Sequence, residues 1–147
     1  MLKTLKFSTT ISTSKERVWN ILFTDENYPK WVEVFCEGSY AKTDWNEGSD
    51  VEFLTPSGEG MFSIIEQKIP NQLMIFNHLG MIKDGKKIHD KKSKQWENAK
   101  ESYELNEKDG ITELTASMDT IDEYITYFNE TFPKALKRIK ELAENII

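Results

Sequence analysis

IDEYITYFNETFPKALKRIKELAENII, residues 121–147, closes the chain and decides its fold. Its apolar residues recur at steps of three and four, which places them on one face of a helix. They are Ile121, Ile125, Phe128, Phe132, Leu136, Ile139, Leu142 and Ile146. A single amphipathic helix that follows an antiparallel sheet must bury this face on the sheet, and a curved sheet gripping one helix readily leaves a hollow between them. We therefore expect the functional site in that hollow.

Pro133 falls inside this helical segment. A proline removes one backbone donor and crowds the carbonyl four residues earlier, here that of Asn129. The sequence therefore predicts a kink at Pro133, or a break with Thr131 capping a second helical segment.

About seven β-like stretches precede the final helix, so the predicted class is α+β. Turn-forming Gly, Asn, Asp and Pro residues separate most of these stretches, and this pattern is typical of a meander and not of alternating βαβ units. The expected strands are residues 2–11, 34–43, 50–54, 60–69, 73–82, 94–106 and 111–120.

Two short helices are expected between the first and second strands. Thr13 and Glu16 have the spacing of a capping box, which opens a helix through about Phe23. Asp25 begins a second, shorter helix that Pro29 limits.

Length and composition favour one domain, residues 1–147, that needs no disulfide or metal to fold. Cys36 is the single cysteine, so no internal disulfide can form. We find no leader peptide and no apolar run near the roughly 20 residues that cross a bilayer. We therefore expect a cytoplasmic protein without a membrane span.

The charge is unevenly distributed along the chain. Residues 83–94 hold six lysines against two aspartates, a local balance of +4, whereas the whole chain carries −6, which leaves −10 for the rest. An acidic body disfavours nucleic-acid binding as the main activity. The lysine-rich segment is expected to be a solvated hairpin tip, with a contact surface for an acidic partner as the alternative.

His78 is the main candidate for chemistry, because Phe76 and His78 share one face of the strand over residues 73–82. A histidine beside a carboxylate can transfer protons near neutral pH, and Glu66, Glu101 and Glu104 are the partners considered. The alternative is a histidine that only satisfies hydrogen bonds in the core. Two histidines and one cysteine without metal-binding spacing predict no metal site, and no nucleotide or other cofactor motif is present.

Several motifs together make the chain resemble the START-like (SRPBCC) helix-grip superfamily, in the branch homologous to the activator of heat-shock-protein-90 ATPase. They are Val18-Trp19, Tyr28-Pro29-Lys30-Trp31, Asp44-Trp45-Asn46-Glu47-Gly48-Ser49, His78-Leu79-Gly80, Trp96, Thr112-Glu113-Leu114 and Phe132-Pro133-Lys134-Ala135-Leu136. The resemblance implies a curved antiparallel sheet, two short helices after the first strand, and a long C-terminal helix packed across a deep cavity for apolar molecules. The co-chaperone of this branch has a further domain ahead of this one, whereas here the first strand begins at once, so direct ATPase activation is the less expected role.

A cavity of this kind would be lined by aromatic rings, which make up 12% of the chain. The same rings can instead fill a core at native density. The expected apolar wall is Phe53, Phe62, Phe76, Trp96, Tyr103, Phe128 and Phe132, with Trp31 at the mouth and Tyr40, His78 and Glu101 orienting polar ends.

Three functions follow from these observations. The first is a carrier or sensor of a small, mostly apolar molecule. The second is an accessory factor that binds a chaperone or another acidic protein through Lys86, Lys87, Lys91 and Lys92. The third is a small cyclase or hydrolase that uses His78 as acid or base.

Overall fold

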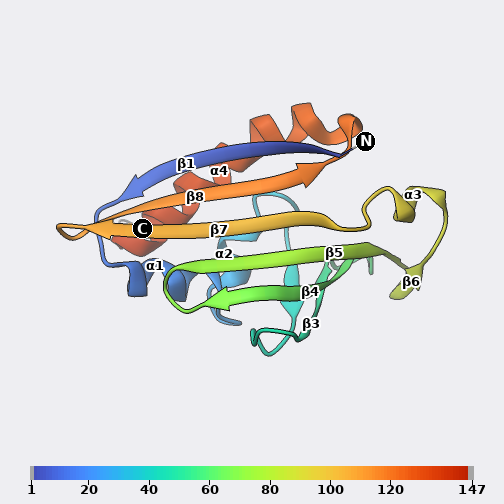
Figure 1. Cartoon of the computed structure of the whole chain (residues 1–147), viewed down its shortest axis with the longest axis horizontal. Helices are drawn as coiled ribbons and strands as arrows, with labels where there is room; N and C mark the ends of the chain where they lie inside the picture. The colour runs from blue at the N-terminus through green and yellow to red at the C-terminus, as the bar shows by residue number, and fades with distance from the viewer. Residues whose placement is uncertain (1, 146–147) are drawn as a thin grey trace.

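Eight antiparallel strands form one sheet, and the long C-terminal helix lies across one of its faces (Figure 1). The computed structural model describes residues 2–145. The strand order is β1-β8-β7-β5-β4-β3-β2, with β6 paired to β5 outside this order. The strands are β1 (Lys3–Ile11), β2 (Tyr40–Lys42), β3 (Asp50–Leu54), β4 (Gly60–Ile69), β5 (Leu73–Lys83), β6 (Lys86–Ile88), β7 (Ala99–Lys108) and β8 (Ile111–Thr120). The α+β class and the helix-grip arrangement are confirmed.

The helices follow the expected order, with one addition. They are α1 (Lys15–Leu22), α2 (Tyr28–Val32), α3 (Lys91–Lys94), the 3-10 turn η1 (Asp122–Tyr124) and α4 (Ile125–Glu144). The addition is α3, a single turn between β6 and β7. We call the sheet face that α1, α2 and α4 cover the inner face, and the opposite face the outer face.

The α4 helix runs without interruption through Pro133, so the predicted break with a cap at Thr131 is wrong. Pro133 and Asn129 are both exposed, so water can satisfy the carbonyl that loses its donor. The predicted apolar face is the one that packs on the sheet. Its buried members are Phe132, Ala135, Leu136, Ile139 and Ala143, and the predicted Ile146 lies outside the described residues.

The cap of α1 is one residue later than predicted. The Ser14 side chain accepts a hydrogen bond from the backbone N–H of Arg17 at 3.2 Å, so Ser14 and not Thr13 is the N-cap. Val18 and Leu22 are on the buried face of this helix.

One predicted strand is much shorter in the structure and another begins five residues later, because the segments that they lose are irregular or helical. The strand expected over residues 34–43 is reduced to β2, and the preceding loop packs Phe35 against Phe128 and Phe132 of α4. The lysine-rich segment is not a plain hairpin tip, because it forms β6 and α3. Trp96 therefore lies after α3 and before β7, not on a strand as predicted.

A β-bulge at Leu79 decides which side chains at the end of β5 face the helices. Phe62 pairs with Gly80 and Ser63 pairs with His78, so Leu79 is an extra residue without a partner on β4. The bulge reverses the alternation of faces along β5. His78, before the bulge, lies on the inner face with its partner Ser63, whereas Gly80, after the bulge, lies on the outer face with its partner Phe62.

Aromatic rings fill much of the space between the inner face and the helices. Phe7 stacks on Phe132 with centroids 5.0 Å apart, and Tyr103 contacts both Phe132 and Trp31. The Trp31 indole N–H donates to the carbonyl of Leu22 at 3.2 Å. Edge-to-face and stacked contacts of this kind stabilise a core beyond the area that they bury.

Candidate functional site

The inner face carries a chain of polar groups centred on His78, supplied by three neighbouring strands. The Oγ of Ser63 on β4 lies 2.6 Å from His78 Nδ1, and Glu101 Oε1 on β7 lies 3.1 Å from His78 Nε2. A neutral imidazole satisfies both contacts when the Ser63 hydroxyl donates to Nδ1 and the Nε2–H donates to Glu101. We call Ser63, His78, Glu101 and Tyr103 the polar chain.

Tyr103 completes the polar chain by donating its hydroxyl hydrogen to Glu101 Oε2. Burial raises the pKa of Tyr103 and of Tyr28 well above the usual value of a tyrosine, and the nearby negative charge of Glu101 raises both further. Both phenols therefore keep their protons at neutral pH and act as donors.

Of the three glutamates considered as partners of His78, the structure selects Glu101. Glu66 instead forms an ion pair with Lys100 on the outer face, and Glu104 is exposed on that face as well. Glu101 and Tyr103 are two residues apart on β7, so their side chains share the inner face.

Ser63 is the member that the sequence reasoning missed. The signal that could have found it is the pairing of β4 with β5, which lies outside any local pattern. A serine, a histidine and a glutamate in successive contact are the residue types of a hydrolytic triad, but Ser63 is only 2% exposed. The Ser63 hydroxyl is therefore covered in this conformation, and the polar chain offers hydrogen bonds of fixed geometry.

Burial differs along the polar chain. The His78 side chain is 7% exposed and that of Glu101 is 18% exposed, so Glu101 is the member that solvent reaches. An unpaired buried carboxylate would be costly, and here two donors compensate it.

Most of the predicted aromatic wall lies on the inner face, near the polar chain. Phe76 packs edge-on against Phe53 with centroids 5.2 Å apart, and Phe53 also contacts the His78 ring. Trp31, Phe76, Tyr103 and Phe132 are almost fully buried, whereas Phe53 and Phe128 are partly exposed. Solvent thus reaches the partly exposed rings and Glu101 but not the deeper rings.

Three predicted site residues lie elsewhere. Phe62 lies on the outer face, because its neighbour Ser63 faces inward and consecutive residues of a strand alternate, so the prediction that it faces the helix is wrong. Trp96 belongs to a second apolar cluster with Ala99 and Ile121. Tyr40 is 41% exposed on β2, at the edge of the sheet.

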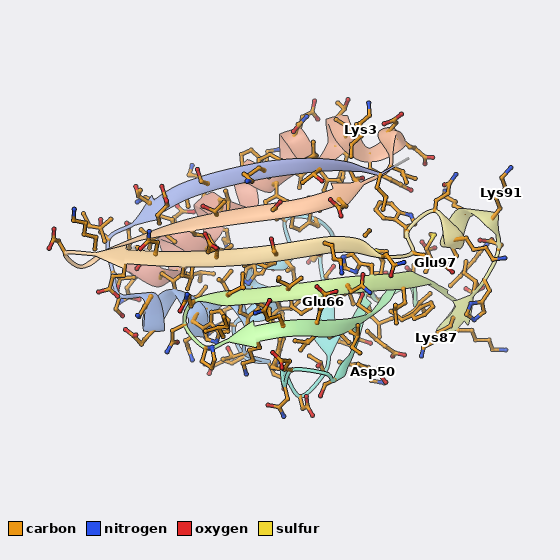
Figure 2. The ribbon with its side chains drawn as sticks, viewed as in Figure 1. Lys3, Asp50, Glu66, Lys87, Lys91 and Glu97 are labelled. Atoms are coloured by element: carbon orange, nitrogen blue, oxygen red, sulfur yellow. The ribbon has the colours of Figure 1, made fainter. Side chains whose placement is uncertain are left out.

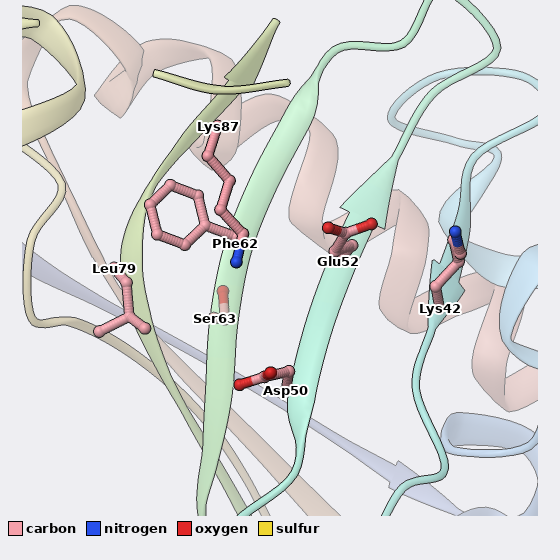
Figure 3. A pocket seen from close by; sticks show the side chains of 7 residues that line it. All are labelled: Lys42, Asp50, Glu52, Phe62, Ser63, Leu79 and Lys87. Carbon is pink, nitrogen blue, oxygen red and sulfur yellow. The ribbon is translucent and has the colours of Figure 1, made fainter. Parts of the chain in front are cut away.

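A hollow of about 220 Å³ lies on the outer face (Figure 3). Figure 3 shows Asp50 and Glu52 between Lys42 on one side and the other lining residues on the other side. The ammonium group of Lys87 lies 5.0 Å from the centroid of the Phe62 ring, a cation–π distance. The remaining lining residues are Ser63 and Leu79.

A second hollow of about 390 Å³ lies between α2 and the edge strand β2. Tyr28, Pro29 and Tyr40 line it, and Trp45 closes it with an indole N–H that donates to Asp25 Oδ1 at 2.9 Å.

The lysine-rich segment forms one exposed end of the molecule. Figure 2 shows Lys87 and Lys91 at this end, beside β6 and α3. All six lysines of the segment are exposed, and Lys92 contacts Glu123 at 3.7 Å. Isolated contacts of this kind contribute little to stability, so these charges remain available to a partner.

Within residues 2–145, no group of three or more potential metal ligands converges. No helix in this part of the chain is long and apolar enough to span a bilayer.

The comparisons with known proteins give one matching family model, and solved structures with the same fold. The model of the family described as "Activator of Hsp90 ATPase homolog 1-like protein" matches residues 12–144. Among curated proteins, none matches this chain.

Three solved structures show the same fold at low sequence identity. The Aha1 dimer from Colwellia psychrerythraea is 18% identical with a TM-score of 0.73, covering 97% of this chain and 96% of that one. Protein MLL2253 from Mesorhizobium loti is 11% identical with a TM-score of 0.77, covering 99% of both chains. CalU16 from Micromonospora echinospora is 13% identical with a TM-score of 0.68, covering 97% of this chain and 76% of that one.

Proposed function

This chain belongs to the family of activator of Hsp90 ATPase homolog 1-like proteins, and from that premise we propose that it binds a small, mostly apolar molecule between the inner face and α4. The observation that carries the proposal is the polar chain at the edge of an aromatic interior, with Glu101 accessible to solvent. Small-molecule sites combine such apolar walls with a few fixed polar groups.

Two partly exposed rings indicate where the molecule enters. Phe53 on β3 and Phe128 on α4 both pack against the core while keeping some exposure. Phe35, in the loop between α2 and β2, contacts Phe128 with centroids 6.4 Å apart. Loops have fewer backbone constraints than the sheet, so movement of the loop that carries Phe35 would widen this entrance at the least cost.

The rings of the interior contact one another, so a ligand must displace some of these contacts. Binding therefore stabilises the folded protein only when the ligand buries enough apolar area to offset the ring contacts that it replaces. Molecules with a chain or ring system wide enough to touch Phe53 and Phe128 together meet this condition. This places the proposed ligand among extended apolar molecules with one polar end.

Native mass spectrometry of gently purified protein tests the proposal directly. We expect a retained small molecule, or one acquired from an apolar ligand library, together with a higher Tm. Met118→Trp places a large side chain beside Glu101, since Met118 is the partner of Glu101 on β8. This variant should lose at least tenfold in affinity.

Ser117→Trp is the matched control, because Ser117 is the neighbouring residue and its side chain faces the outer side of β8. Circular dichroism must show that both variants fold. Equal ligand affinity in the two variants would contradict a site between the inner face and α4.

A second function is favoured by the exposed lysines around β6 and α3. The family description names activation of the Hsp90 ATPase, and a lysine-rich end of an otherwise acidic protein is suited to an acidic protein partner. Under this alternative the protein acts as an accessory factor, and the inner face has no direct role.

The ATPase rate of an Hsp90 with and without this protein tests the alternative. Reversal of Lys86, Lys87, Lys91 and Lys92 to Glu should abolish any stimulation, and added salt should weaken it. The control reverses four exposed lysines elsewhere, Lys6, Lys108, Lys134 and Lys137, which changes the net charge equally. Equal loss in both variants would show that only net charge matters.

A further inference from the structure

We propose that the polar end of the bound molecule is a hydrogen-bond donor, preferably a cationic ammonium group, and not a carboxylate. This inference rests on the proposed function and names the class of ligand for it. Its basis is that the Glu101 side chain, on the inner face, remains partly open to solvent, at 18% exposure.

The groups that contact Glu101 are donors already committed to it. Tyr103 donates to Oε2 and His78 lies 3.1 Å from Oε1. The two donors are thereby turned toward Glu101 and away from an incoming carboxylate. A ligand that reaches this place meets the remaining acceptor capacity of Glu101, since a carboxylate accepts about four hydrogen bonds.

Lysine side chains do not neutralise this carboxylate. Lys100, the residue before Glu101, turns to the outer face and pairs with Glu66. Met118 of β8 and Phe76 of β5 are the cross-strand partners of Glu101. Partial burial in such apolar surroundings strengthens the interaction with a ligand charge, because screening by water is reduced.

The influence of Glu101 on its surroundings supports this reading. Its negative charge raises the pKa of Tyr28, which lies on α2, and that of Tyr103, which lies on β7. A ligand carboxylate beside Glu101 would be repelled by its negative charge, because two like charges at one site disfavour each other. An ammonium or hydroxyl group would instead find an acceptor.

Three probes of equal chain length test the proposal: decylammonium, decan-1-ol and decanoate, the two ions below their micellar concentrations and the alcohol below its solubility limit, at neutral pH. We expect the wild-type protein to bind decylammonium at least tenfold tighter than decanoate, with decan-1-ol between them. Titration calorimetry or quenching of tryptophan fluorescence gives the three Kd values.

Glu101→Gln keeps the shape of the side chain and removes its charge, and should reduce the ratio of the two affinities at least fivefold. Glu104→Gln is the matched control, because Glu104 lies on the same strand but is exposed on the outer face. This control should leave the ratio unchanged. Glu101→Asp retains the charge and should retain the preference for ammonium.

Each outcome decides the matter. Decanoate binding as tightly as decylammonium in the wild type, or a ratio unaltered by Glu101→Gln, would overturn the inference while leaving the proposed function intact. Failure of all three probes to bind would overturn the proposed site itself. If Glu101→Gln does not fold, the order of affinities in the wild type and in Glu101→Asp still gives the answer.

Discussion

The two faces of the sheet hold polar groups under opposite conditions. On the inner face, Glu101 and His78 are largely removed from water and each meets a partner at hydrogen-bond distance. On the outer face, Asp50 and Glu52 share a wide hollow with lysines and remain in contact with solvent. Burial, and not the presence of charge, therefore distinguishes the polar groups of the inner face from those of the outer face.

The largest difference between the faces should appear on removing a ring. Phe76 on the inner face is 1% exposed, so Phe76→Ala should lower the free energy of unfolding by about 3–5 kcal/mol. Phe62 on the outer face is partly exposed, and Phe62→Ala should cost about 1 kcal/mol. Urea denaturation measures both, and equal costs would show that the two faces are packed alike.

Breaking the polar chain should have the next largest effect. His78→Ala leaves Ser63 and Glu101 without their partner, which should cost roughly 3 kcal/mol. Lys100→Ala breaks the exposed pair with Glu66 on the outer face and should cost less than about 1 kcal/mol. A small effect of His78→Ala in the same denaturation experiment would mean that water replaces the lost contacts.

The pH dependence should distinguish the buried tyrosines from an exposed one. The pKa of Tyr28 and of Tyr103 is raised in the folded state, so their stabilising contribution is complete below the unfolded pKa of about 10. It is lost as pH rises beyond that value, because only the unfolded chain releases these protons. Each tyrosine should contribute a loss of up to about 1.4 kcal/mol per pH unit.

Replacement of Tyr28 and Tyr103 by Phe should therefore flatten the alkaline decline in stability. Tyr40→Phe is the control, since Tyr40 is exposed on β2. Urea denaturation between pH 9 and pH 11 measures the slopes. An unchanged slope in the double variant would refute the burial of these two phenols.

The smallest expected effect is that of salt on the outer face. The contribution of Lys100 with Glu66 should be about 0.5 kcal/mol or less and should disappear in molar salt. The cost of Glu101→Gln should change little with salt, because its partners lie inside the protein. Denaturation of each variant at low and high ionic strength compares the two, and equal salt sensitivity would show that the inner face is as wet as the outer.

Local patterns in the sequence predicted the elements that depend on neighbouring residues. The apolar repeat of residues 121–147 predicted the packing face of α4, because helical periodicity is a property of the segment alone. The shared face of Phe76 and His78 follows equally from the alternation of one strand, and the structure confirms it.

Features that depend on how strands pair could not be predicted in the same way. Phe62 was predicted to face the helix because it is an aromatic residue on a strand, but its face depends on the pairing of β4 with β3 and β5, which places Ser63 inward and Phe62 outward. Ser63 and Glu101 reach His78 from two other strands, and the sequence offered three glutamates without a means to choose among them. The positions of Phe35 and Trp96 depend on irregular segments whose geometry is set by the surfaces that they cover.

Leu79, which has no partner on β4, determines which face each of the following residues of β5 takes. If Leu79 were deleted, the side chains that follow it on β5 would point to the opposite faces of the sheet. Met81 and Ile82 would then exchange faces, and the apolar surface on each face would lose one of these residues. Insertion or deletion of one residue here is therefore a far more drastic change than most substitutions. An aligned relative that lacks this extra residue should have the opposite choice of side chains from this point to the end of the strand.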